Sequence, residues 1–133
     1  MTATPIYAQT PIFTAIAISA TANTSRATSV GVPTSGVLIS PNTNTNGIRV
    51  DQINVFGQGT TLAGQIIIWK YDGTNAYPVT EITVSVVVPT TTSVGFYTSL
   101  IPVNFVLQAG DKLYATSQVA SQLVAVGING GAF

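Results

Sequence analysis

The side chains that could do chemistry are few in this chain of 133 residues. It has no histidine and no cysteine, and its charged residues are four basic and four acidic ones. General acid–base catalysis usually employs histidine or paired carboxylates, and a nucleophilic serine needs a base beside it. The composition therefore predicts a protein that is not an enzyme and that binds no cofactor and no metal.

Each of the four carboxylates has a structural interpretation. Asp72 and Asp111 lie beside turn glycines, where an aspartate side chain usually accepts hydrogen bonds from its own backbone. Asp51 lies two residues after Arg49, at a point where we expect a β-bulge. Glu81 alternates with apolar residues, so we expect it on the polar face of a strand, opposite a lysine. We expect no two of them to face each other as the carboxylates of a glycosidase do.

Three other kinds of site lack essential parts. The segment Asp72-Gly-Thr-Asn75 resembles an acidic calcium loop, but calcium takes roughly six to eight oxygen ligands and only one carboxylate is local. A Ser–Lys pair would need Lys70 or Lys112, and we expect both at surface positions of strands. Gly57-Gln-Gly59 precedes a strand rather than a helix, so it lacks the context of a dinucleotide-binding loop.

Three aromatic residues, Trp69, Tyr71 and Tyr77, surround the Asp72-Gly73 turn. If exposed, such rings could form a stacking platform for a sugar. In the other interpretation they form cross-strand pairs, each of which contributes up to about 1 kcal/mol. We favour the pairs, because the flanking strand is too apolar for a groove that faces solvent.

The elements that must position these residues are β-strands, because every periodic segment alternates with a period of two. The alternating segments are residues 12–18, 80–88, 103–107 and 122–128. In the clearest of them, Ile82, Val84, Val86 and Val88 share one face. β-branched residues dominate throughout, and no stretch shows the spacing of an amphipathic helix.

Other signals refine this pattern. Residues 65–71 are apolar on both faces, which predicts either a central strand covered on both sides or a strand whose outer face meets another subunit. Between Gly47 and Gly57 the alternation slips, and we place a β-bulge at Asp51-Gln52.

Asn46-Gly47 and Asp72-Gly73 are dipeptides favoured in hairpin turns. Five prolines are interpreted as ends of strands: Pro33, Pro41, Pro78, Pro89 and Pro102.

Together these signals predict an all-β protein, a jelly-roll-like β-sandwich of about eight antiparallel strands. We expect a single domain over residues 12–133, preceded by an extended N-terminal arm over residues 1–11. Pro5, Ile6 and Tyr7 are apolar anchors within that arm.

The charge balance bears on partners and location. A formal net charge of zero argues against binding to nucleic acid or to an anionic membrane surface. Polar residues interrupt every apolar run before it is long enough to cross a membrane. The N-terminus lacks the basic start and apolar core of a signal peptide, so we expect synthesis in the cytoplasm. Near-zero net charge favours association, as in a component of a fixed assembly.

A series of strand and turn motifs runs from residue 47 to the end of the chain. They are Gly47-Ile-Arg-Val-Asp-Gln-Ile53, Gly57–Thr61, Ala63-Gly64, Lys70-Tyr-Asp-Gly-Thr74, Glu81-Ile82, Val106-Leu-Gln-Ala-Gly-Asp-Lys-Leu-Tyr-Ala115 and Gly130-Gly131. In these motifs the chain resembles a family of small all-β structural proteins of tailed bacteriophages. It departs from the family in residues 1–46, which match loosely, and at Ala132-Phe133, which replace a common acidic residue.

The resemblance implies a head decoration (cement) protein on the surface of the virion. Such a protein stabilises the capsid by bridging copies of the major capsid protein, typically as a homotrimer. The candidates for contact with the capsid are Pro5, Ile6, Tyr7 and Phe133. Two alternatives stay open. One is a carbohydrate-binding tail or fibre domain that recognises host glycans through Trp69, Tyr71 and Tyr77, and the other is a structural protein of the tail or neck.

Overall fold

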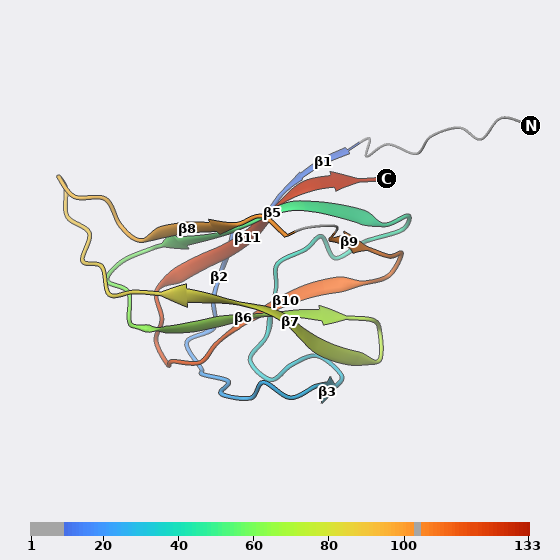
Figure 1. Ribbon diagram of the computed structural model, residues 1–133, viewed down its shortest axis with the longest axis horizontal. Helices are drawn as coiled ribbons and strands as arrows, with labels where there is room; N and C mark the ends of the chain where they lie inside the picture. Colours follow the sequence, from blue (N-terminus) through green and yellow to red (C-terminus); the bar gives the residue numbers. More distant parts are fainter. Residues whose placement is uncertain (1–9, 103–104) are drawn as a thin grey trace, which may run out of the picture.

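The computed structural model describes residues 10–102 and 105–133, which form two antiparallel β-sheets that face each other (Figure 1). The six-stranded sheet contains β1 (Thr10–Phe13), β11 (Val124–Ala132), β5 (Ile48–Gly57) and β8 (Tyr97–Leu100) in that order, with β2 (Ile16–Ala17) beside β11 and β9 (Val106–Leu107) beside β5. The five-stranded sheet has the order β3 (Ser29–Val30), β7 (Asn75–Val84), β6 (Gly64–Tyr71), β10 (Lys112–Ser117) and β4 (Val37–Leu38). The all-β prediction is confirmed.

The described residues contain eleven strands rather than about eight. Four of them, β2, β3, β4 and β9, have only two residues each. A strand this short shows no alternation, so the sequence could not reveal it. These residues form no helix, and hence none that could cross a membrane.

The core lies between the two sheets and is built from the alternation that the sequence predicts. In β11, Val124, Val126 and Ile128 are fully buried, as expected for residues 122–128. In β5, the buried residues are Ile48 and Val50 before the bulge and Ile53 and Val55 after it. The Asp51 bulge is confirmed, because Asn129 pairs with Gln52 whereas Gly130 pairs with Val50. The extra residue keeps both halves of the strand facing the core.

Strand β7 differs from its prediction at both ends. It begins at Asn75 and contains Pro78, so the prediction that this proline ends a strand is wrong. Pro78 is tolerated because it lies at a second bulge: Ile68 pairs with Thr80 and Trp69 with Pro78. The strand ends at Val84, and Val86 and Val88, expected on its buried face, are each 60% exposed.

The buried hydroxyl of Thr61 accounts for the early end of β7. It donates to the Ser85 carbonyl at 2.6 Å and accepts from the Val87 N–H at 3.0 Å. Both bonds hold residues 85–87 against the loop before β6, so this segment does not continue along the sheet. Residues 85–96 then form a loop that projects beyond both sheets, at the left of Figure 1.

The first predicted strand, residues 12–18, is interrupted. Ile12 and Ile18 are buried, but Ile16 is 39% exposed. At Thr14 the ladder is half made: the Thr14 N–H donates to the Ile128 carbonyl at 3.0 Å, but the Ile128 N–H donates to the Thr14 hydroxyl, also at 3.0 Å, instead of to its carbonyl. The same hydroxyl donates to the Ile39 carbonyl in the opposite layer.

The N-terminal arm ends earlier than the sequence predicts. Thr10 and Pro11, which we placed in the arm, belong to β1 and pair with Ala132 and Gly131. Proline is compatible with this position because β1 is an edge strand. Residues 1–9 lie outside the described residues, and so does Val103 of the predicted strand 103–107.

Strand β6 is the central strand of the five-stranded sheet and is covered on both faces. Ile66 and Ile68 face the core between the sheets, whereas Ile67 and Trp69 form a second cluster on the outer face. A strap of residues 19–36 runs across this outer face, below β6, β7 and β10 in Figure 1. Of the two interpretations of residues 65–71, the covered central strand is the one that the structure adopts, with cover from the same chain.

Candidate functional site

All four carboxylates make contacts that stabilise the fold. Arg49 and Asp51 form a two-point contact on the surface, at 2.7 and 3.2 Å. Asp111 is largely buried and lies 3.4 Å from the Lys70 ammonium. Glu81 pairs with Arg26 of the strap, so the expectation of a lysine opposite it is wrong; Ile67 occupies the opposite position in β6.

Asp72 and Asp111 both organise turns, as the sequence predicts. One oxygen of Asp72 accepts the N–H groups of Thr74 and Asn75, each at 2.8 Å. These two hydrogen bonds lower the pKa of Asp72 below its ordinary value of 3.8. Asp111 accepts the Gln108 N–H at 3.0 Å. In the described part of the chain, no three acidic residues gather where they could hold a metal ion.

The three aromatic residues proposed as a sugar platform do not form one. Trp69 is fully buried, and its indole N–H donates to the Thr116 hydroxyl at 2.8 Å. Tyr71 packs edge-on against Tyr114 of the neighbouring strand, with ring centres 5.9 Å apart. Burial, with a smaller contribution from Tyr71, raises the pKa of Tyr114. Tyr77 alone of the three is well exposed, at 41%. The glycan alternative therefore fails at Trp69, and the favoured cross-strand pairs do not join these three rings either, because Trp69 pairs with Pro78 and Tyr77 with Lys70.

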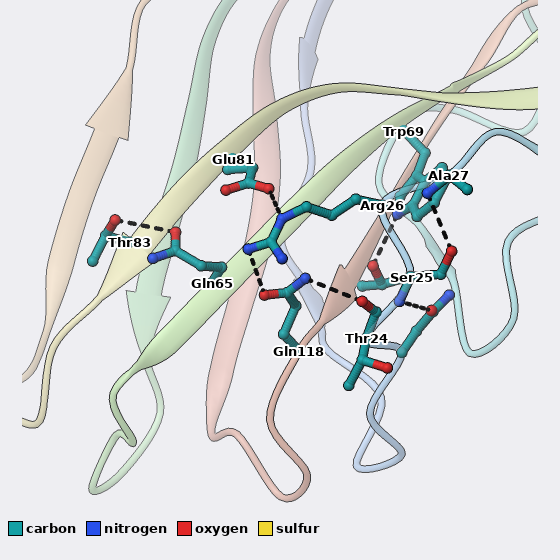
Figure 2. Close-up of polar contacts among 11 residues, drawn as sticks. Thr24, Ser25, Arg26, Ala27, Gln65, Trp69, Glu81, Thr83 and Gln118 are labelled. Carbon is teal, nitrogen blue, oxygen red and sulfur yellow. Dashed lines mark hydrogen bonds and ion pairs between the residues drawn. The ribbon is translucent and has the colours of Figure 1, made fainter.

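Figure 2 shows how the strap is held over the tryptophan. The Arg26 side chain extends between Glu81 of β7 and Gln118, which follows β10, and its guanidinium donates to both. The strap backbone is fixed at a second point, where the Asn23 N–H donates to the Ser117 carbonyl at 2.8 Å. One strap side chain thus bridges β7 and the residue that follows β10, and the Trp69 ring lies under the strap.

The residues predicted to contact the capsid lie near the two ends of the chain. Phe133 is half-buried, its N–H donates to the Gly47 carbonyl at 3.1 Å, and its ring lies beside Gly47. It packs against its own chain in this structure. Pro5, Ile6 and Tyr7 lie outside the described residues.

A groove on the outer face of the six-stranded sheet is the best-formed cavity among the described residues that the sequence did not reveal. Its volume is about 350 Å³. Phe13 stands on one side, and Phe56 and Tyr97, which are direct cross-strand partners, stand on the other. The three rings are 57–74% exposed, although Phe13 comes from β1, Phe56 from β5 and Tyr97 from β8.

The floor of this aromatic groove is made of small residues, and its polar groups carry no charge. Ala15, Ala125 and Gly127 form the floor. Asn54 lies between the rings, where its side-chain oxygen accepts a hydrogen bond from the Tyr97 hydroxyl at 3.3 Å. Thr14 and Gln58 complete the lining. No charged side chain lines the groove.

The projecting loop, residues 85–96, is a second exposed apolar surface. Val86 and Val88 are each 60% exposed and Val94 is 89% exposed. Its base is fixed by Thr61 and by the Gly57 N–H, which donates to the Phe96 carbonyl at 2.7 Å. The loop therefore presents valine side chains from an anchored base.

No protein-family model, no curated protein and no solved structure matches this chain.

Proposed function

We propose that this chain is a head decoration (cement) protein of a tailed bacteriophage, made in the host cytoplasm and located on the surface of the virion head. It binds and stabilises the shell by bridging copies of the major capsid protein, and it acts as a homotrimer. Its action is mechanical and involves no cofactor. A position in the tail or neck of the same particle is the rival that the experiment below must separate.

The observation that carries the proposal is the character of the surface. Large apolar side chains are exposed on the projecting loop and on the outer sheet, whereas the carboxylates are engaged in turns and ion pairs. An exposed apolar surface of this kind is expected to be covered by a partner. Zero net charge removes the repulsion that keeps freely diffusing proteins apart. Both properties suit a protein that is fixed in a shell.

The positions of the family-like motifs add support. Gly47 and Gly73, two of the shared glycines, have φ angles of 101° and 96°, which other residues rarely adopt. Asp111, in the motif that runs from Val106 to Ala115, closes the turn between β9 and β10. A jelly-roll-like connectivity is part of the proposal, and it is supported by the chain passing between the sheets after β2, β4, β5, β7, β9 and β10.

The contacts proposed with the capsid are the projecting loop, Phe133, and Pro5, Ile6 and Tyr7 of the N-terminal arm. A standard stable contact buries about 800 Å² on each partner. Repeated over a shell, such contacts would stiffen it against internal pressure.

The test uses expanded heads of the encoding phage that lack this protein. The full chain should bind them at a fixed number of copies per head. A variant without residues 1–9 retains every described strand, so we expect it to keep the thermal midpoint of the full chain but no longer to bind. Full binding by the truncated variant would refute the role of the arm. Binding of the full chain to isolated tails, and not to heads, would refute the proposal itself.

A further inference from the structure

The aromatic groove defined by Phe13, Phe56 and Tyr97 has features that capsid binding does not require. We propose that it is a binding site for an uncharged oligosaccharide. The proposal does not depend on the function proposed above, because a decoration protein or a tail protein could equally carry such a site on its outer sheet.

The first argument is the arrangement of the rings. The flat faces of sugar rings carry C–H groups that pack against aromatic side chains, and they do so best where the rings are exposed but held in place. Phe56 and Tyr97 lie side by side on paired strands, and the Tyr97 hydroxyl is tied to Asn54. Phe13 lines the groove from β1, which is separated from β5 and β8 by β11. A sugar ring lying between these walls would contact aromatic surface on two sides.

The second argument is the floor. Ala125 lies directly opposite Phe56, and Gly127 lies directly opposite Asn54 in the sheet. A larger side chain at position 125 would fill the space between the rings, whereas the space above Gly127 is already occupied by the Thr14 carbonyl and the Ala15 Cα. A cavity of about 350 Å³ lies in the range of small-molecule sites.

The third argument is a set of uncharged hydrogen-bonding groups at that floor. The Thr14 carbonyl is turned out of the β-ladder, because the Ile128 N–H bonds to the Thr14 hydroxyl instead, and it lies over Gly127. Asn54 uses its side-chain oxygen on Tyr97, which leaves two N–H donors on its amide. The Asn54 amide thus offers two donors to sugar hydroxyls.

The absence of charge in the lining selects the class of ligand. A sialic acid or uronic acid would bring a carboxylate with no cation in the groove to pair with it. A basic peptide would likewise find no carboxylate there. The groove therefore suits neutral hexose or N-acetylhexosamine units.

The test measures binding of cellohexaose, maltohexaose, mannohexaose and N-acetylchitohexaose to the full chain by saturation-transfer NMR and titration calorimetry. At least one of them should bind. Tyr97→Ala and Phe56→Ala should each weaken that binding about tenfold or more, as for aromatic hot spots in other interfaces. Ala15→Phe, which fills the floor from an exposed position, should abolish it.

Tyr77→Ala is the matched control, because Tyr77 is an exposed tyrosine on the other sheet and should leave binding unchanged. Fluorescence of the buried Trp69 and the urea midpoint report whether each variant is folded. The proposal is overturned if none of the four oligosaccharides binds, or if binding is indifferent to Tyr97→Ala and Ala15→Phe. It is also overturned if sedimentation shows that Tyr97→Ala dissociates an oligomer of this chain, because the groove would then be a protein interface.

Discussion

The carbonyl oxygen of Thr14 lies over Gly127, 1.6 Å from the point where a Cβ atom at position 127 would stand. The contact exists because the Thr14 hydroxyl, rather than its carbonyl, accepts the Ile128 N–H. One side-chain hydrogen bond therefore interrupts the first strand and places a carbonyl against the last strand where only a glycine fits.

Replacing this glycine should damage the fold. In Gly127→Ala the new methyl group would overlap the Thr14 carbonyl, so residues 14 and 15 must move off the sheet. We expect a loss of about 3 kcal/mol in the free energy of unfolding, the upper end for overpacking, measured by urea denaturation. Gly95→Ala is the control, because its methyl group would make ordinary contacts at 3.5 Å, and we expect a change within about 0.5 kcal/mol. Equal effects of the two substitutions would contradict this geometry.

The hydrogen bond from Trp69 to Thr116 should contribute measurably to stability. Thr116→Val keeps the shape of the side chain but leaves a fully buried indole N–H without its acceptor. The expected loss is about 1–3 kcal/mol in the free energy of unfolding. Thr83→Val removes a hydrogen bond to Gln65 on the surface, at 3.1 Å, and should cost less than about 0.5 kcal/mol. A Thr116→Val protein as stable as the parent would show that the bond contributes nothing net.

Asp72 gives the stability of the protein a defined dependence on pH. Its pKa is lower in the folded protein than its ordinary value of 3.8, because the ionised form accepts the N–H groups of Asn75 and Thr74. Its contribution is therefore fully present above about pH 4 and is lost as the pH falls through the folded-state pKa. Asp72→Asn keeps an acceptor oxygen but cannot titrate, so its stability should fall less steeply below pH 4. NMR titration of the Asp72 carboxyl carbon with a midpoint at or above 3.8 would disprove this.

The contact of Arg26 with Glu81 and Gln118 should hold the strap closed over Trp69. In Arg26→Ala we expect acrylamide to quench Trp69 fluorescence more efficiently, while the free energy of unfolding changes by less than about 1 kcal/mol, as for an exposed ion pair. Arg49→Ala removes a comparably exposed pair on the other sheet and should leave quenching unchanged. If acrylamide quenches Trp69 fluorescence in both variants as it does in the parent, the closure of the strap over Trp69 does not depend on Arg26.

The sequence predicts what depends on local alternation. The slip of the pattern in residues 47–57 locates the Asp51 bulge, and the apolar run of residues 65–71 indicates a strand covered on both faces, although it leaves open whether the cover comes from the same chain or from another subunit. It also identifies Asp72 and Asp111 as turn residues, because the adjacent glycines mark the turns. In each case the residues that decide the structure are neighbours in the chain.

The features that the sequence does not predict depend on strand pairing over long distances. The alternation puts Phe13 on the face opposite Ile12, but nothing local indicates that it faces Phe56 and Tyr97 across the sheet. The strap over Trp69 has no periodic pattern, so the sequence does not show which segment covers the ring. Residues 80–88 alternate to their end, yet a hydroxyl outside the strand, that of Thr61, stops β7 at Val84.

Cryo-electron microscopy of the virion that contains this chain tests the central proposal most directly. If the chain is a head decoration protein, its β-sandwich will appear as trimers on the outer surface of the head, seated where several major capsid subunits meet. Density for the sandwich in the tail, neck or fibres, with a bare outer surface on the head, would contradict it.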